Sequence, residues 1–234
     1  MSQSALNQSK NYHSTLAFAE ERYIAGDYDQ ALSVFRDLAG SGNTTAQMWV
    51  GACLAGGQGV QASMSQAFEW YLLAAQGGHA QAQTNAGAML VMGQGCEVDI
   101  EAGLGWLEAA ADSDDCGAQF NLATLYSQGD HIEQDYIKAV EWYRRAAELG
   151  HFPSQARLGY LYLQGLGVSK DRVEAFVWLS LAAQHGVGTA LSQLERVINI
   201  MSNEEKQRGM ALVDERRMRS ADSGVSPRLQ PIPG

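Results

Sequence analysis

The chain has 234 residues, 46% of them hydrophobic, and its 16 basic and 26 acidic residues give a formal charge of −10 at pH 7. This hydrophobic content is enough for a folded core and excludes global disorder. The acidic balance excludes nucleic acid or an anionic membrane as the main partner, because both attract basic surfaces.

The N-terminal segment lacks the apolar core of a signal peptide, and no apolar run is long enough to cross a membrane. The three cysteines, Cys53, Cys96 and Cys116, are far apart and odd in number. Such cysteine usage is typical of reduced, cytosolic proteins and not of a disulfide framework. We therefore expect a cytoplasmic protein without membrane insertion.

The first predicted repeat unit covers residues 11–45. Its sequence LAFAEERYIAGDYDQALSVFRDLA, residues 16–39, predicts two helices joined by a short turn at Gly26. The run GDYDQA and the later Phe35 stand where tetratricopeptide repeats have such residues, so this unit resembles that family. We expect residues 1–10, which precede it, to be disordered.

From residue 46 to residue 189 the sequence repeats with a period of 36 residues, without insertion or deletion over four units. The tryptophans that mark the period are Trp70, Trp106, Trp142 and Trp178, and the Ala-Ala pairs begin at Ala74, Ala110, Ala146 and Ala182. A fixed period of this length indicates a stack of helix pairs, each of which buries its apolar face against its neighbours.

The first helix of each repeat is predicted to run for about eleven residues, starting from Ala46, Ala82, Ala118 or Ser154. A small residue recurs in its middle, at Gly51, Gly87, Ala123 and Gly159. Glycine in a helix costs about 1 kcal/mol of propensity against alanine. Its repetition therefore predicts the close approach of a neighbouring helix.

The second helix of each repeat is predicted to begin at a capping residue. These residues are Ser63, Asp99, Asp135 and Asp171. Their side-chain oxygens accept hydrogen bonds from the unpaired N–H groups of a helix N-terminus, and Gln66 and Glu174 extend two of the caps into capping boxes. The alternative, that the aspartates bind metal, conflicts with their even distribution of one per repeat.

The stretch AVEWYRRAAELGH, residues 139–151, resembles an acid–base or anion site at first sight. Its apolar face is predicted to consist of Ala139, Trp142 or Tyr143, Ala146 and Ala147, with the tryptophan filling the gap between helix pairs. Its charged residues are Glu141, Arg144, Arg145 and Glu148. Because the equivalent residues of the other repeats differ in charge, we expect these charges to face water. His151 and its equivalent His79 are assigned a role in the turn that follows the second helix.

Residues 190–220 are predicted to close the stack. Residues 190–200 repeat the pattern of a first helix, and a polar helix capped by Ser202 with Glu205 follows. Solenoids need such polar end caps. Residues 221–234 hold three of the four prolines and are predicted to be a disordered tail.

The repeated positions form the pattern A-x-x-x-L-G-x-x-Y-x-x-G-x-G-V-x-x-D-x-x-x-A-x-x-W-x-x-x-A-A-x-x-G, best seen in residues 154–186. This pattern closely resembles the Sel-one-like repeat (SLR), a relative of the tetratricopeptide repeat. The resemblance implies an all-α fold, a right-handed α-solenoid of helix-turn-helix repeats, in which the first helices line a concave, protein-binding side. The family is common in bacteria, so a bacterial source is expected. Cys96 and the loop GDHIEQD, residues 129–135, depart from the pattern without affecting the expected fold.

Transferring the tetratricopeptide register places one set of side chains in the concave groove. The members predicted to bind a protein partner or peptide segment are Trp49, Asn85, Phe120, Asn121, Thr124, Gln128, Arg157, Tyr160 and Gln164. An amide such as Asn85 or Asn121 offers both a donor and an acceptor to an extended peptide, and aromatic residues and arginine are enriched at binding hot spots. Two other interpretations stay open. In one, Trp49 and Phe120 pack between neighbouring first helices; in the other, the amides are solvated and the protein binds elsewhere.

The predicted function is that of a non-catalytic adaptor or scaffold, with no cofactor, metal, nucleic acid or small-molecule substrate. None of the motifs H-E-x-x-H, G-x-S-x-G and G-x-x-x-x-G-K-[ST] is present. An alternative is a regulatory protein that docks through its C-terminal helix and tail, residues 202–234. A hydrolase is least favoured, because the family's enzymatic members carry a disulfide in each repeat, a spacing that the three cysteines here do not follow.

Overall fold

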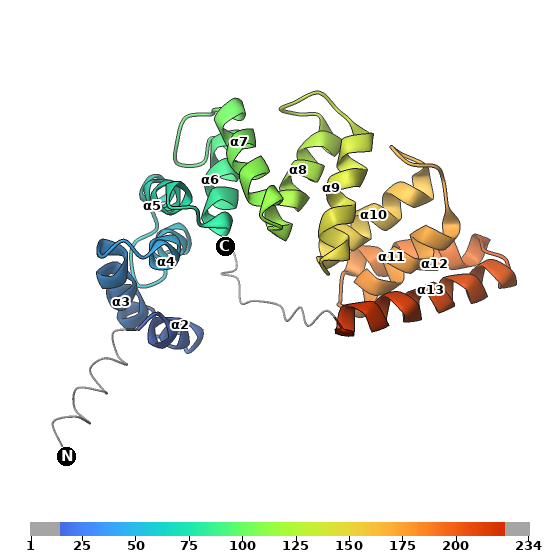
Figure 1. Ribbon diagram of the computed structural model, residues 1–234, viewed down its shortest axis with the longest axis horizontal. Helices are drawn as coiled ribbons and strands as arrows, with labels where there is room; N and C mark the ends of the chain where they lie inside the picture. Colours follow the sequence, from blue (N-terminus) through green and yellow to red (C-terminus); the bar gives the residue numbers. More distant parts are fainter. Residues whose placement is uncertain (1–14, 223–234) are drawn as a thin grey trace, which may run out of the picture. The chain divides into compact units, whose positions relative to one another are not determined.

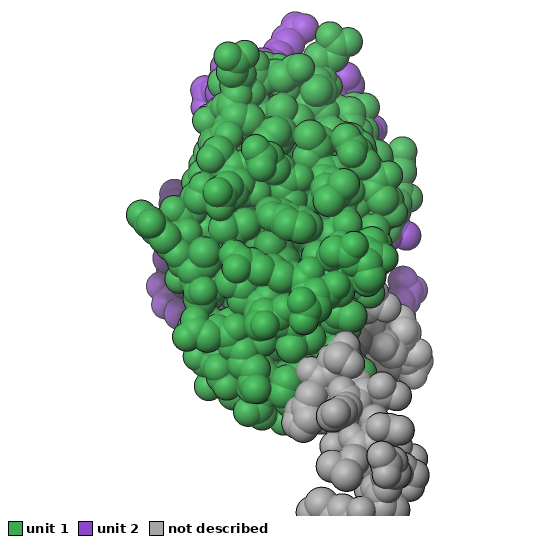
Figure 2. All heavy atoms as spheres, turned by 90° about the vertical axis from the view of Figure 1, so that its left-hand side faces the viewer, with its two compact units in different colours: residues 1–113, 229–234 green, residues 114–228 purple. Residues whose placement is uncertain are grey.

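The computed structural model describes residues 15–222, and this part of the chain holds twelve helices and no strand (Figure 1). The all-α repeat fold predicted from the sequence is confirmed. The described residues divide into two compact units, residues 15–113 and 114–222, which Figure 2 colours separately. The segment 1–10, predicted to be disordered, lies outside the described residues, as does the segment 221–234 except for the last two residues of the final helix.

Unit 1 consists of three helix pairs, and each helix packs on the next one along the chain. In chain order the helices are α2 (Leu16–Ile24), α3 (Tyr28–Gly40), α4 (Thr44–Gly56), α5 (Met64–Gln76), α6 (Ala80–Met92) and α7 (Ile100–Asp112). The pair α2 and α3 corresponds to the tetratricopeptide-like unit expected at the N-terminus.

Unit 2 continues the same pattern for two pairs and then changes it. Its helices are α8 (Cys116–Gln128), α9 (Tyr136–Glu148), α10 (Phe152–Gln164), α11 (Arg172–Gln184), α12 (Gly188–Ile200) and α13 (Asn203–Asp222). Only Met201 and Ser202 connect α12 to α13, and α13 packs against α11. The closing helix therefore covers the second helix of the last repeat.

The first helices begin two residues before the predicted starts. Their capping residues are Asn43, His79, Asp115 and His151, at one position of the repeat. Asn43 Oδ1 accepts a hydrogen bond from the Ala46 N–H at 2.9 Å, and His79 Nδ1 accepts one from the Ala82 N–H at 3.3 Å. The predicted starts lie too far along the chain because they mark the first buried residue of each helix and not its cap. The turn role assigned to His79 is thus, more specifically, that of a helix cap, whereas the side chain of His151 makes no cap hydrogen bond and lies 2.7 Å from Ser154 Oγ instead.

The second helices begin at the predicted caps: Ser63, Asp99, Asp135 and Asp171 each accept a backbone N–H from the first turn. The two predicted capping boxes differ from expectation. The Ser63 N–H donates to the Leu54 carbonyl and the Asp171 N–H to the Tyr162 carbonyl, at 2.9 and 3.1 Å. Carbonyl groups of the first helices already accept hydrogen bonds from these N–H groups. The side chains of Gln66 and Glu174 therefore do not form the second hydrogen bond of a capping box.

The predicted close approach at the small residue of the first helix is confirmed. A Cβ added to Gly51 would lie 2.8 Å from the Tyr71 ring, and one added to Gly87 would lie 2.8 Å from the Gly103 carbonyl oxygen. Glycine therefore stands where a neighbouring helix contacts the backbone itself.

In three of the four repeats the tryptophan fills the space between helix pairs only in part, since Trp70, Trp106 and Trp142 are half-buried and pack against the core. The residue after it is the buried one, as with Tyr143, which is 2% exposed beside a half-buried Trp142. Trp178 is the exception at 4% exposed, because α13 places Arg216 over its ring. The helix turns by about 100° per residue, so two adjacent large residues cannot both face the same neighbour.

A glutamine that recurs at one position of the first helices was not predicted to have a structural role; Gln47 and Gln155 are buried and Gln83 is half-buried. Gln47, Gln83 and Gln155 donate from Nε2 to the carbonyls of Ala39, Ala75 and Ala147, at 3.3, 3.3 and 3.1 Å. Each bond joins a first helix to the end of the second helix before it. Gln47 and Gln83 are 36 residues apart and Gln155 follows Gln83 after two such periods, which was the available signal. Buried polar groups need such partners.

The closing helix α13 begins with the predicted capping box. The Ser202 N–H donates to Glu205 Oε2 at 2.7 Å, and the Glu205 N–H donates to Ser202 Oγ at 3.1 Å. Gly209 lets α13 approach α11, since a Cβ there would lie 2.6 Å from the Phe176 ring.

Candidate functional site

Trp49, the first of the predicted groove residues, lies in the core of unit 1. It is 5% exposed, its ring stacks on Phe35 with centroids 5.3 Å apart, and its indole Nε1 donates to Glu20 Oε1 at 3.2 Å. This geometry matches the interpretation in which Trp49 packs between helices. Asn85, on α6 of the same unit, is half-buried.

Phe120 and Thr124 on α8 are half-buried, and a hydrogen bond joins the Thr124 side chain to the Phe120 backbone. Thr124 Oγ1 donates to the Phe120 carbonyl at 2.8 Å and lies 3.0 Å from the Tyr143 hydroxyl. The Phe120 ring contacts both Tyr143 and His151 edge-on, with centroid distances of 5.7 and 5.2 Å. These two side chains therefore form the floor of the α8 surface, with part of each open to solvent.

Arg157, Tyr160 and Gln164 on α10 are exposed and stand at positions i, i+3 and i+7, so they share one face of the helix. On α8, Gln128 is exposed and Asn121 is half-buried. Within the described residues, the side chains of all five form no hydrogen bond or ion pair. Unit 2 therefore presents polar and aromatic groups on two first helices, with donors and acceptors that no intramolecular partner uses.

His151 lies at the N-terminus of α10, beneath this surface. Burial lowers its pKa, and the carboxylate of Asp115 opposes the shift. Its Nδ1 is 2.7 Å from Ser154 Oγ. The neutral imidazole is therefore the form that suits the folded protein.

The charged residues of α9 are not all solvated as predicted. Glu141 and Glu148 are exposed, but Arg144 and Arg145 are half-buried. Arg145 stacks on Trp142, with Cζ 4.6 Å from the ring centroid, and lies 3.7 Å from Asp114 Oδ1. Arg144 Nη2 donates to the Tyr162 hydroxyl at 2.8 Å. The two arginines differ from the carboxylates because their long stems reach aromatic rings on the protein surface.

An open cleft of about 460 Å³ lies in unit 2, among α9, α10, α11 and α13. The residues that give it its character are Arg144, Tyr162, Lys170, Glu174, Trp178 and Arg216. Arg216 Nη2 donates to both carboxylate oxygens of Glu174, at 3.1 and 3.0 Å, and its Cζ lies 4.0 Å from the Trp178 ring centroid. The sequence carries no local signal for this cleft, because it depends on how the closing helix packs.

Three further features limit the chemistry of the described residues. Cys53, Cys96 and Cys116 are free thiols, and burial raises the pKa of Cys53 to about 11, which suppresses its reactive thiolate. No group of three or more histidine, cysteine or carboxylate side chains in residues 15–222 is placed to hold a metal ion. In the same residues, no helix has the length and apolar content needed to cross a membrane.

Solved structures of repeat proteins resemble this chain. The Sel1 repeat protein from Oxalobacter formigenes is 29% identical over 90% of this chain and 85% of that one, with a TM-score of 0.74. The protein c5321, a protective antigen of uropathogenic Escherichia coli strains with an SLR fold, is 30% identical over 96% of this chain, with a TM-score of 0.73. This chain spans only 49% of c5321.

A putative Sel1 repeat protein from Klebsiella pneumoniae, 24% identical over 83% of this chain and 96% of that one, shares the fold with a TM-score of 0.55. No curated protein sequence matches the chain. The model of the Sel1 repeat matches residues 44–79, 80–115, 117–151 and 153–187. These four matches cover more than half of the chain and coincide with its helix pairs, so the chain belongs to the Sel1 repeat family.

Proposed function

We propose that this protein is a non-catalytic scaffold that holds an extended segment of a partner protein against the exposed face of its first helices. Sel1 repeat proteins are generally protein-interaction scaffolds, which supports the class of function. The finer proposal concerns the surface formed by Asn121 and Gln128 on α8 and by Arg157, Tyr160 and Gln164 on α10, called here the first-helix surface.

The observation that carries the proposal is the set of unused polar groups on α10. Arg157, Tyr160 and Gln164 share one helix face, and Tyr160 leaves 38% of its surface exposed. Their side chains use none of their donors or acceptors within the described residues. Tyrosine and arginine are the residue types that contribute most to binding energy when a partner covers them.

The chemistry of this surface fits a peptide segment better than a small molecule. Asn121 and Gln128 carry amides that pair with the N–H and C=O groups of an extended backbone. Phe120 and Thr124 provide the supporting floor, and Trp49 supports the corresponding helix of unit 1 from inside the core. The guanidinium group of Arg157 suits a carboxylate or a backbone carbonyl of the bound segment.

Affinity capture from cells that make the protein tests this proposal. We expect the double variant Arg157→Ala, Tyr160→Ala to lose a protein that the wild type retains, because it removes the two strongest contacts without opening the core. The matched control is Ile137→Ala, Glu141→Ala, which alters two exposed residues on α9. Equal capture by the wild type and the α10 variant, or loss only with the α9 control, contradicts the proposal.

The proposed setting is the cytoplasm of a bacterium. The three free cysteines support a reducing compartment, and the similar solved structures come from bacteria. Fractionation of the source cell tests this: recovery of the protein with a cytoplasmic marker enzyme is expected, and recovery in the periplasmic or secreted fraction contradicts it.

A further inference from the structure

The cleft of unit 2 contains two cationic side chains that no carboxylate neutralises. Arg144 and Lys170 line it, and within the described residues neither forms an ion pair. The single hydrogen bond of Arg144 goes to the Tyr162 hydroxyl. A guanidinium group has five N–H donors in a planar fork, so Arg144 keeps most of its donors for a further partner.

Three of the other four charged side chains of the cleft have partners within the described residues. Arg216 and Glu174 satisfy each other at 3.0 Å, with side chains only 28% and 24% exposed. Asp171 Oδ1 accepts the N–H groups of Val173 and Glu174 as the cap of α11. Glu148 remains without a partner, but it is exposed, where solvent screens its charge. The lining therefore carries three cations and three carboxylates, and within the described residues the charges that form no ion pair are Arg144 and the exposed Lys170 against the exposed Glu148 and the capping Asp171.

Trp178 supplies a second observation at the cleft, a buried indole donor that is closed to solvent and has no acceptor among the described residues. It lines the cleft, it is 4% exposed, and its indole Nε1 has no acceptor among the described residues. A buried donor without an acceptor costs about 1–3 kcal/mol. By contrast, the buried Trp49 of unit 1 uses its Nε1 to bond Glu20.

We propose that this cleft binds a carboxylate group of a partner protein, between Arg144 and Lys170 and beside the indole of Trp178. Arg144 donates to the carboxylate oxygens, and Tyr162, whose oxygen accepts from Arg144, offers its own O–H as a further donor. A phosphate dianion is disfavoured, because Glu148, Asp171 and Glu174 also line the cleft. The volume of about 460 Å³ exceeds that of a carboxylate, so the residues that flank it in the partner enter with it.

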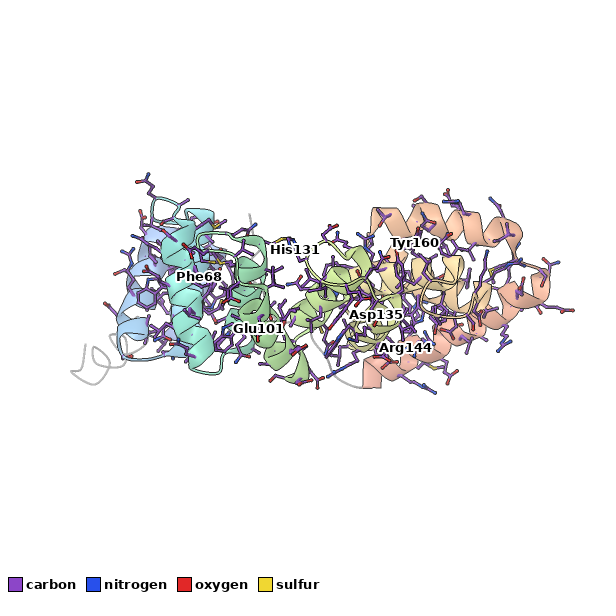
Figure 3. The ribbon with its side chains drawn as sticks, turned by 90° about the horizontal axis from the view of Figure 1, so that it is seen from above. Phe68, Glu101, His131, Asp135, Arg144 and Tyr160 are labelled. Atoms are coloured by element: carbon purple, nitrogen blue, oxygen red, sulfur yellow. The ribbon has the colours of Figure 1, made fainter. Side chains whose placement is uncertain are left out.

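This binding site is separate from the first-helix surface. Figure 3 labels Arg144 and Tyr160 toward opposite edges of unit 2. No residue of the first-helix surface lines the cleft. The two proposals therefore stand or fall independently, and one partner that fills both sites must wrap around unit 2.

The resonance of the Trp178 indole N–H tests the proposal on the full-length protein. The five tryptophans give a simple indole spectrum after ¹⁵N-tryptophan labelling, in which Trp178→Phe identifies the resonance. The probes are N-acetylglycine, which carries a chain-end carboxylate, and N-acetylglutamic acid α-amide, which carries a side-chain carboxylate. N-acetylglycinamide serves as the neutral control and inorganic phosphate as the competing anion, all at constant ionic strength.

We expect a saturable downfield shift of the Trp178 resonance with at least one carboxylate probe, with a Kd on the order of millimolar. The probe with the lower Kd shows whether the carboxylate of the partner belongs to its chain end or to an acidic side chain. N-acetylglycinamide is expected to leave the resonance in place. No saturable shift with either carboxylate, or tighter binding of phosphate than of both, overturns the proposal.

Arg144→Gln is expected to lower the affinity of the protein for the carboxylate probe by about tenfold or more, because it removes a charged hydrogen-bond donor. Arg145→Gln is the matched control one residue along α9, since Arg145 stacks on Trp142 and does not line the cleft. Lys170→Gln, in the exposed loop before α11, weakens binding without touching the fold. Unchanged affinity in both Arg144→Gln and Lys170→Gln contradicts the assigned site.

Discussion

The two units close their outer ends in different ways. At the start of unit 1, Tyr23, Phe35 and Trp49 form a chain of ring contacts between α2, α3 and α4. At the end of unit 2, α13 packs on α11 through an arginine that covers a tryptophan and binds a glutamate. Both ends contain a buried tryptophan, but among residues 15–222 an acceptor for the indole N–H is found for Trp49 and not for Trp178.

The difference shows that a stack of similar helix pairs can be closed by apolar packing at one end and by charged contacts at the other. At the end of unit 1, aromatic rings pack around Trp49, and its indole N–H is bonded to Glu20. Polar packing at the end of unit 2 leaves a charged cleft with unused donors. An end cap that is held by ion pairs therefore covers the last repeat and at the same time forms the cleft for which we propose carboxylate binding.

The largest effect is expected for Phe35→Ala at the end of unit 1. Phe35 is fully buried and stacks on Trp49, so its truncation should lower the free energy of unfolding by about 3–5 kcal/mol. Denaturant unfolding followed by circular dichroism measures this change. A loss below that of Arg216→Ala would show that the aromatic packing is not what closes this end.

Arg216→Ala at the end of unit 2 is expected to have a smaller effect, of about 1–2 kcal/mol. It removes two charged hydrogen bonds and the contact with Trp178, but the Arg216–Glu174 pair is partly solvent-exposed and therefore weaker than a buried one. The same unfolding measurement applies. Arg217→Ala on the adjacent, exposed residue is the control, and an equal loss in both variants argues against a specific contact.

Replacing each tryptophan by phenylalanine isolates the indole N–H. Trp49→Phe removes the hydrogen bond to Glu20, whereas Trp178→Phe removes a donor with no acceptor among the described residues. Both rings are similarly buried, so the loss of packing is comparable. We expect Trp49→Phe to be more destabilising by about 1 kcal/mol. The reverse order would mean that Trp178 has a partner in solution.

The smallest expected effect concerns one position of the repeat, which is His151 in unit 2 and Asn43 in unit 1. Burial lowers the pKa of His151 from 6.5, so the unfolded chain binds the proton more readily. Its contribution to stability is complete above about pH 6.5 and is lost as the pH falls through the lowered, folded-state pKa. His151→Asn places at this position the residue that caps α4 in unit 1, and should flatten the loss of stability between about pH 7.5 and pH 5.5, about one unit either side of the normal value. An identical pH profile in both proteins contradicts this assignment.

Most of the fold was predictable because its determinants are local and repeated. The period of the tryptophans and alanines, the capping oxygens and the central glycines each act within one helix pair. The choice between Trp142 and Tyr143 as the buried residue was not predictable, since adjacent side chains point about 100° apart at the edge of the apolar face and the tilt of the helix decides which one is buried. The cleft was not predictable either, because Arg216 meets Glu174 and Trp178 only through the packing of α13.

The predicted groove residues differ in the same way. Arg157, Tyr160 and Gln164 are exposed where the register of the repeat places them. Trp49 is buried because α2 and α3 surround it with aromatic rings, a feature of the N-terminal unit and not of the repeat. Register alone therefore identifies the exposed face in the middle of a stack, whereas the identity of the neighbouring unit decides burial at its end.

The central claim, that a partner lies against the first-helix surface, is tested most directly by photo-crosslinking in the source cell. A benzophenone amino acid replaces Tyr160 in one variant and Ile137 on α9 in the other, both exposed positions of unit 2. We expect a crosslinked protein adduct from position 160 and none from position 137. An adduct from position 137 alone would contradict the account, as would the absence of any adduct at position 160.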